Sequence, residues 1–173
     1  MCRLYAQLAT TPRSAEGALL CGARALAAQS RHHRDGWGLG ATGPEQTVLF
    51  KAPRAAGTDP HFAGVARTLR APAIVAHIRK ATVGSVQRSN AHPFRHQRWV
   101  FAHNGSLFGF DALRPRMWAR IRPGLRALVR GSTDSEVLFF YLLSALEQAG
   151  EAAAQAGEAI RGALGLLLWV FLY

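Results

Sequence analysis

Cys2 is the residue of this chain best placed for nucleophilic chemistry. Attack by a thiol requires the thiolate, a base that forms it, donors for the developing oxyanion and groups that hold the substrate. A free Cys has a pKa of about 8.5, so a partner must accept its proton at neutral pH. Once Met1 is removed, the α-amine of Cys2, with a pKa of about 7.7 to 8.0, is that partner. The position favours an N-terminal thiol nucleophile, although a Cys judged alone is more often a small buried hydrophobic residue.

Five short motifs follow Cys2 along the chain. They are HRDGWGLG at 33–40, AHIRKATVG at 76–84, NAHPF at 90–94, FAHNGSL at 101–107 and GSTDSE at 131–136. In this order, behind a Met-Cys start, they resemble the class II glutamine amidotransferases of the N-terminal-nucleophile (Ntn) hydrolase superfamily, most closely the stand-alone bacterial type. The resemblance covers residues 1–145 most strongly.

The resemblance implies a catalytic group and a substrate-binding group of residues. The catalytic group would be the nucleophile Cys2 with Asn104 and Gly105, whose side-chain amide and backbone N–H would hold the oxyanion. The substrate-binding group would pair Arg79 with the substrate α-carboxylate, place Thr82 in the wall of the glutamine pocket and pair Asp134 with the α-ammonium. A planar guanidinium suits a carboxylate better than an ammonium does.

Most of these residues also have a plain structural interpretation. Arg79 could be a surface arginine at a strand end, and Thr82 could be present for its β-propensity. Asn104-Gly105 is a strong hairpin-turn signal. Asp134 could complement the positive end of a helix, a role compatible with substrate binding.

Some features depart from the family pattern or lie outside it. Many relatives carry Arg-Gly-X-Asp where this chain has His32-His33-Arg34-Asp35, so no catalytic arginine is assigned there. Val83 stands where some amidotransferases have His, and His92 is interpreted as structural. Cys21 is expected in the core.

The resemblance implies hydrolysis of glutamine or another γ-glutamyl amide through a thioester on Cys2, without a metal or organic cofactor. The histidines support no metal site, because His92 and His96 flank Pro93 and lack a second ligand cluster. The ammonia would be released or passed to a separate partner protein. An alternative is a γ-glutamyl amide hydrolase in thiol metabolism.

The net charge of +11 raises a second class of function, a non-enzymatic polyanion-binding protein. The only lysines are Lys51 and Lys80, and the arginines are densest in the run 114–130. Arg122, Arg126 and Arg130 would share one face of a helix. Without any nucleic-acid-binding motif this face is expected to be solvated, and no nucleic-acid partner is expected.

Apolar periodicity predicts the elements that must position these residues. Strands are expected at 1–10, 48–50, 74–79 and 99–104, and a turn at 32–40. Helices are expected at 15–30 behind Ser14 as N-cap, from a capping box at Thr133 to Glu136 onward, and at 150–163. The elements agree with the fold that the resemblance implies: α+β, a four-layer αββα sandwich of two mainly antiparallel sheets.

The chain is expected to form one domain over residues 1–173 and to stop before the family's last strands. Two cysteines and the absence of a signal-like start favour the cytoplasm. The apolar run 164–173 is too short to cross a membrane and is interpreted as a buried strand or helix end.

Overall fold

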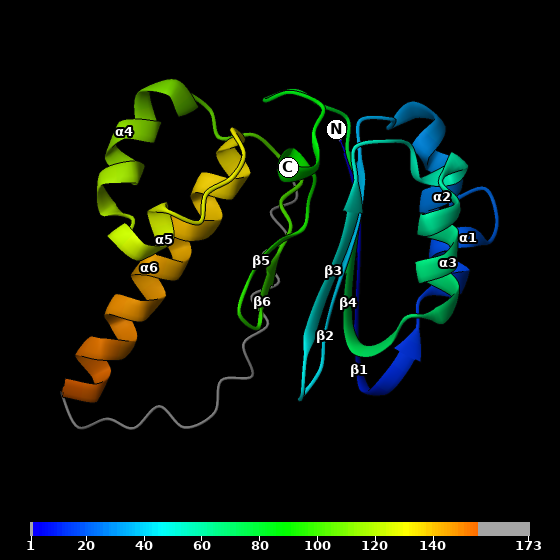
Figure 1. Cartoon of the computed structure of the whole chain (residues 1–173), viewed down its shortest axis with the longest axis horizontal. Coiled ribbons are helices and arrows are strands. Elements are labelled where there is room, and N and C mark those ends of the chain that lie inside the picture. The colour runs from blue at the N-terminus through cyan, green and yellow to red at the C-terminus, as the bar shows by residue number, and fades with distance from the viewer. Residues whose placement is uncertain (1, 156–173) are drawn as a thin grey trace.

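A four-stranded antiparallel sheet in the order β1-β4-β2-β3 forms one inner layer of the protein, in a computed structural model that describes residues 2–155 (Figure 1). The strands are β1 (Arg3–Ser14), β2 (Trp37–Thr42), β3 (Thr47–Ala52) and β4 (Arg70–Ile78). β4 lies in the interior of this sheet, and its residues 73–78 are all buried. The strand predicted at 74–79 is thus confirmed up to Ile78, and its apolar residues suit a strand that is covered on both faces.

A two-stranded antiparallel sheet forms the second inner layer. It consists of β5 (Phe94–His96) and β6 (Trp99–Phe101). The strand predicted over 99–104 therefore ends at Phe101. Val75 of the large sheet packs against Val100 and Ala102, with Leu4 beside them, so the two sheets share a small apolar core.

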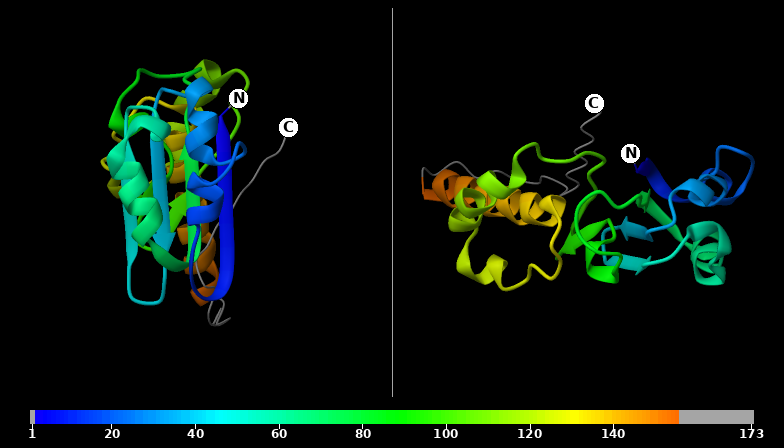
Figure 2. Two further views of the ribbon diagram at one scale, coloured as in Figure 1. Left: turned by 90° about the vertical axis from the view of Figure 1, so that its right-hand side faces the viewer. Right: turned by 90° about the horizontal axis from the view of Figure 1, so that it is seen from above.

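Helices cover the outer face of each sheet, as the views from the side and from above agree (Figures 1 and 2). The large sheet carries α1 (Glu16–Leu20), α2 (Leu26–Gln29) and α3 (Pro60–Thr68). The small sheet carries α4 (Phe110–Arg120), α5 (Pro123–Arg126) and α6 (Asp134–Gln155). Within residues 2–155 the remaining elements are three short 3₁₀ turns, η1 (Ser30–His32), η2 (Ala56–Thr58) and η3 (Arg88–Asn90). The predicted α+β, four-layer αββα sandwich is confirmed.

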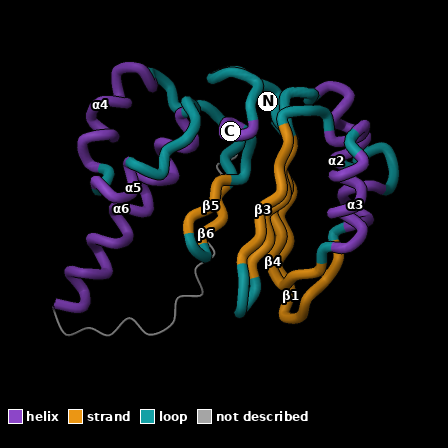
Figure 3. Tube along the Cα trace, viewed as in Figure 1, coloured by secondary structure: helices purple, strands orange, loops and turns teal. Residues whose placement is uncertain are grey.

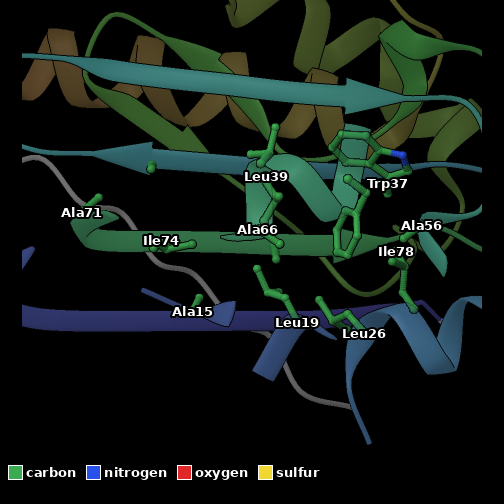
Figure 4. Packing of buried hydrophobic residues seen from close by; sticks show 14 residues of the cluster. Ala15, Leu19, Leu26, Trp37, Leu39, Ala56, Ala66, Ala71, Ile74 and Ile78 are labelled. Carbon is green, nitrogen blue, oxygen red and sulfur yellow. The ribbon is translucent and has the colours of Figure 1, made fainter. Parts of the chain in front are cut away.

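The larger apolar core lies between the four-stranded sheet and its helices (Figure 4). Trp37 is fully buried in it and meets Phe62 of α3 edge to face, with ring centroids 5.1 Å apart. The indole N–H of Trp37 donates to Asp59 Oδ2 at 2.8 Å. Asp59 also accepts from the backbone N–H of His61 and thereby caps α3. The capping aspartate thus satisfies the polar atom of the central aromatic ring.

The predicted turn at 32–40 is wrong from Trp37 onward, because β2 begins there. Gly38 and Gly40, which suggested a turn, instead let the second sheet and the segment before it lie close to β2. A Cβ on Gly38 would overlap the carbonyl oxygen of His92, and one on Gly40 would lie 2.6 Å from Val100 Cγ1. Gly in a strand commonly marks such a close approach.

The helix predicted over 15–30 is broken. Gly22 adopts a positive φ of 84°, and α1 and α2 lie on either side of it. Ala15 is the N-cap of α1, so the predicted N-cap at Ser14 is wrong, although Ser14 Oγ accepts from the N–H of Glu16 at 3.1 Å. Cys21 lies in the break and is exposed, so its expected core position is wrong.

The arginine run 114–130 does not form one helix. Its chain is helical to Arg120, extended at Ile121, and helical again only from Pro123 to Arg126. Arg122 and Arg130 lie outside both helices, so the predicted arginine face does not exist. The proline at 123 explains the break, because proline favours the first turn of a helix and disfavours a helical residue before it.

One half of the predicted capping box is confirmed, because Thr133 Oγ1 accepts from the N–H of Glu136 at 3.2 Å. The Glu136 carboxylate, however, reaches past Thr133 to the N–H groups of Arg130 and Gly131. α6 continues through Gln155, so residues 150–155 of the predicted second helix extend α6. Its remainder and the run 164–173 lie outside the described residues. Within 2–155, no helix has the length and apolarity needed to cross a bilayer.

Candidate active site

Three segments meet at one end of the four-stranded sheet. Strand register places Arg3 and Trp37 on either side of Ile78, the last residue of β4. Cys2, Asp35-Gly36 and Arg79-Lys80 therefore leave the sheet side by side. The loops that follow β4 and β6 lie at this same end (Figure 3).

The Cys2 thiol is held by the backbone of Lys80. The N–H of Lys80 lies 3.2 Å from Sγ, and Sγ lies 3.4 Å from the Lys80 carbonyl oxygen. Burial raises the pKa of the Cys2 thiol, the Lys80 N–H and the charge of Arg79 lower it, and Asp35 raises it. The site thus supplies a hydrogen-bond donor and positive charge for a thiolate, against the cost of desolvation.

Asp35 fixes the loop that carries Lys80. Its carboxylate accepts from the N–H of Ala81 at 2.8 Å, and its own N–H donates to the Arg79 carbonyl at 3.1 Å. Arg79 N–H returns a bond to the carbonyl of Gly36 at 2.7 Å. The sequence pattern indicates only a turn in this segment and misses Asp35 as a residue that places the thiol contact.

Arg79 is buried, with 3% exposure, next to the thiol. Its guanidinium donates to the carbonyls of Ser85, Val83 and Gly84 at 2.8, 2.6 and 2.9 Å. The surface-arginine interpretation is therefore wrong. Three of the five N–H groups of an arginine already hold the loop 83–85 in place.

Asn90 secures that same loop from the other side, a role that the sequence pattern does not indicate. It is fully buried, and its amide donates to the carbonyl of Ser85 at 3.0 Å. Its side-chain oxygen accepts from the N–H of Ser132 at 2.8 Å. The Arg79 loop is thereby joined to the segment that precedes α6. A buried amide with both ends satisfied rigidifies its surroundings.

Asn104 lies beside Cys2, the predicted nucleophile. Its side-chain amide donates to the Cys2 carbonyl at 3.3 Å, across 102 residues of sequence. Gly105 follows in the exposed turn after β6. The structure therefore brings the predicted oxyanion segment next to the predicted nucleophile.

Asp134 is buried at the start of α6, and both of its oxygens are engaged. Oδ1 accepts from the N–H of Ser135 at 2.7 Å, and Oδ2 accepts from the N–H of Leu107 at 2.7 Å. The helix-start interpretation of Asp134 holds, and the Leu107 contact connects this carboxylate to the Asn104-Gly105 turn. Thr82 lies in the exposed part of the loop after Lys80.

His77 and His92 lie between the sheets, with ring centroids 4.5 Å apart. Within the described part of the chain their ring nitrogens have no hydrogen-bond partner. Burial lowers the pKa of His77 to about 3 and that of His92 well below its ordinary value, so both rings are neutral at pH 7. His92 also meets Phe94 edge to face, which agrees with its structural interpretation. Over residues 2–155, no three His, Cys, Asp or Glu side chains gather into a metal site.

Residues 1–168 match the family model of the class-II glutamine amidotransferases. The chain is 34% identical over 122 residues to the Escherichia coli protein YafJ, covering 67% of this chain and 44% of that one. It is 30% identical over 102 residues to the probable glutamine amidotransferase DUG3 of Saccharomyces cerevisiae, covering 59% of this chain and 29% of that one. The chain thus spans less than half the length of these two relatives.

Two further matches agree with the family model. A gamma-glutamyl-hercynylcysteine sulfoxide hydrolase of Mycolicibacterium smegmatis is 33% identical over 116 residues, which cover 61% of this chain and 51% of that one. The solved structure of a glutamine aminotransferase class-II domain protein from Silicibacter pomeroyi is similar with a TM-score of 0.56 and 31% identity. It covers 72% of this chain and 53% of that one.

Proposed function

Because the chain belongs to the class II glutamine amidotransferases, we propose that it hydrolyses the side-chain amide of glutamine, or of another γ-glutamyl compound, with Cys2 as nucleophile. One observation carries the proposal. The Cys2 thiol lies against the N–H of Lys80 at 3.2 Å while the Asn104 amide reaches the carbonyl of the same cysteine at 3.3 Å. Nucleophile and oxyanion donor therefore occupy one corner of the fold.

Catalysis begins with the removal of the thiol proton. Burial raises the pKa of Cys2, so the thiol needs a base in contact with it. After Met1 has been excised, the α-amine of Cys2 accepts this proton directly or through a water. The Lys80 N–H and the charge of Arg79 stabilise the resulting thiolate.

The thiolate then attacks the amide carbon of the substrate. As the C–S bond forms, negative charge moves to the carbonyl oxygen, where the Asn104 amide and the Gly105 N–H donate to it. The C–N bond breaks, and the leaving nitrogen takes the proton held by the α-amine and departs as ammonia. Water then attacks the thioester, the C–S bond breaks, and the γ-carboxylate product leaves with the thiol restored.

Three side chains hold the substrate's amino-acid end in this proposal. Arg79 supplies positive charge for the α-carboxylate, through the N–H groups that its loop bonds leave over. Thr82 lines the exposed wall of the pocket. Asp134 pairs with the α-ammonium, since its bonds to Leu107 and Ser135 leave room for about one more at a carboxylate.

A γ-glutamyl amide hydrolase is the second candidate. The similarity to the mycolicibacterial gamma-glutamyl-hercynylcysteine sulfoxide hydrolase favours it. Both candidates attack the same γ-carbonyl and differ only in the leaving amine. In the first, residues 1–173 act as a single amidotransferase domain in the cytoplasm, and ammonia would pass to a separate protein.

Intact mass and activity test the hydrolase. Intact mass is expected to show that Met1 is absent, and a glutamine-like diazoketone is expected to add one equivalent at Cys2. Glutamine and a γ-glutamyl thiol conjugate serve as competing substrates. Cys2→Ala is expected to abolish both labelling and hydrolysis.

Cys21→Ser provides the matched control, because Cys21 is the exposed cysteine of the α1–α2 break. This variant is expected to label and hydrolyse like the wild type. Wild-type protein that neither loses Met1 nor reacts with the diazoketone would overturn the proposal.

A further inference from the structure

We propose that His103 is a positioning residue that clamps the oxyanion segment to the start of α6. The inference rests on the proposed function and adds a residue to which that function assigns no role. His103 directly precedes Asn104 and Gly105 and is buried, with 6% exposure. Its Nδ1 lies 3.0 Å from the hydroxyl oxygen of Ser135, the second residue of α6.

The single hydroxyl proton of Ser135 determines which partner donates in the bond between His103 Nδ1 and Ser135 Oγ. The Ser135 hydroxyl lies 3.1 Å from Asp134 Oδ1, and an ionised carboxylate only accepts. The single hydroxyl proton of Ser135 is therefore directed to Asp134, and the hydroxyl oxygen must accept from His103. His103 consequently carries its proton on Nδ1 and leaves Nε2 bare. Burial lowers the pKa of His103, against the opposing charge of Asp134, which is consistent with a neutral ring.

The same pair of helix residues holds the other end of the turn. The N–H of Leu107 donates to Asp134 Oδ2 at 2.7 Å. Residues 103 and 107 are thus both tied to the Asp134-Ser135 unit, and the three residues between them form a closed turn. That turn presents the Asn104 amide toward Cys2.

Gly105 lies next to the Nε2 edge of the His103 imidazole. A Cβ on Gly105 would lie 2.8 Å from His103 Nε2 and 3.3 Å from Cε1. The ring therefore occupies the space that any side chain at 105 would need, and glycine at this position lets the backbone that carries the Gly105 N–H run close to the clamped ring. Oxyanion donors act through such fixed placement, and a misplacement of about 1 Å can cost about 100-fold in rate.

The kinetic test compares His103→Leu and Ser135→Ala with their controls. Each variant is expected to lower kcat by about 10- to 100-fold, with a smaller change in KM, because the oxyanion donors act in the transition state. The double variant is expected to lose no more than the worse single variant, since both remove one link. His103→Asn, whose amide can donate near the position of Nδ1, is expected to restore most of the loss.

Ser144→Ala is the matched control for Ser135→Ala. Ser144 is also buried on α6 and hydrogen-bonded, to the Phe140 carbonyl and the Arg122 N–H, and these partners lie away from the turn. Its variant is expected to lower thermal stability and leave kcat unchanged. Equal kcat losses for both serine variants, or additive losses in the double variant, would overturn the clamp.

A second measurement is independent of catalysis and separates failure of the clamp from failure of the proposed function. Ring ¹⁵N shifts of His103 in the wild-type protein are expected to show a protonated Nδ1 and an unprotonated Nε2, and Ser135→Ala is expected to change them. The opposite tautomer refutes the clamp even in an active enzyme. The expected tautomer in a protein that the diazoketone does not label supports the clamp and refutes only the hydrolase.

Discussion

Gly38→Ala measures how tightly the two sheets are packed beneath the site. The added Cβ would overlap the His92 carbonyl oxygen and lie 2.9 Å from the His92 carbonyl carbon and from Pro93 Cδ. A carbon and a carbonyl oxygen ordinarily stay about 3.3 Å or more apart, so β2 and the 92–93 segment must separate by about 1 Å. The obstacle is backbone and proline ring, which cannot rotate aside.

Overpacking of this kind costs about 1–3 kcal/mol, and we expect the upper end, about 3 kcal/mol, for a collision with backbone. For a domain of this size each kcal/mol lowers the melting temperature by about 2–4 °C, so the expected fall is about 6–12 °C. Thermal and urea unfolding followed by far-UV circular dichroism measure it.

Gly64→Ala is the matched control in the same protein. Gly64 lies within α3 (Pro60–Thr68) and is exposed, and a Cβ added to it would meet no atom within 4 Å. Alanine in a helix is favoured over glycine by about 0.5–1 kcal/mol, so this variant is expected to melt slightly higher than the wild type. If Gly38→Ala has the same melting temperature as the wild type or as Gly64→Ala, the two sheets are not in close contact.

Three further outcomes are expected, two at the candidate site and one at the buried Lys51. Asp35→Asn keeps an oxygen for the Ala81 N–H but removes a charge that raises the Cys2 pKa, so the pH midpoint of Cys2 alkylation is expected to move down; an unchanged midpoint contradicts this. Asn104→Ala is expected to lower kcat for glutamine by about 100- to 1,000-fold with labelling of Cys2 retained, and a near-normal kcat would remove it from the oxyanion site. Burial lowers the pKa of Lys51 to about 8, so the folded state binds fewer protons than the unfolded state above that pH. The unfolding free energy of the wild type relative to Lys51→Met is therefore expected to rise with pH from about 8 toward 10, and a flat difference contradicts this.

Local patterning is sufficient where an element depends on its own apolar residues. β4 is predictable because residues 74–78 are apolar except for His77 and lie inside a sheet covered on both sides. The start of α6 is predictable because Thr133 and Glu136 carry a capping signal that needs no distant partner. Apolar periodicity misses the outer helix α3, although Asp59-Pro60 is an N-cap followed by a proline at the first helical position.

Elements that depend on distant contacts cannot be predicted in this way. The glycines of β2 resemble a turn locally, and only the approach of His92 and Val100 from the other sheet explains them. Likewise, the motifs predict which residues form the site, but they do not predict that the Arg79 guanidinium makes three bonds to its own loop. Asp35, Asn90 and His103 escape assignment because their role is to hold other residues, which spacing along the chain does not reveal.

These holding contacts explain how a site made of loops keeps its geometry. The Cys2 thiol contacts the backbone N–H of Lys80, and hydrogen bonds of Asp35 and Arg79 hold the loop that carries Lys80. Arg79 also bonds the loop 83–85, which Asn90 connects to the segment before α6. The turn 103–107, which carries the proposed oxyanion donors, is hydrogen-bonded to that same helix start. The proposed nucleophile, the proposed carboxylate-binding arginine and the proposed oxyanion donors are thus all connected to the start of α6, so a change there is expected to alter kcat without touching the thiol.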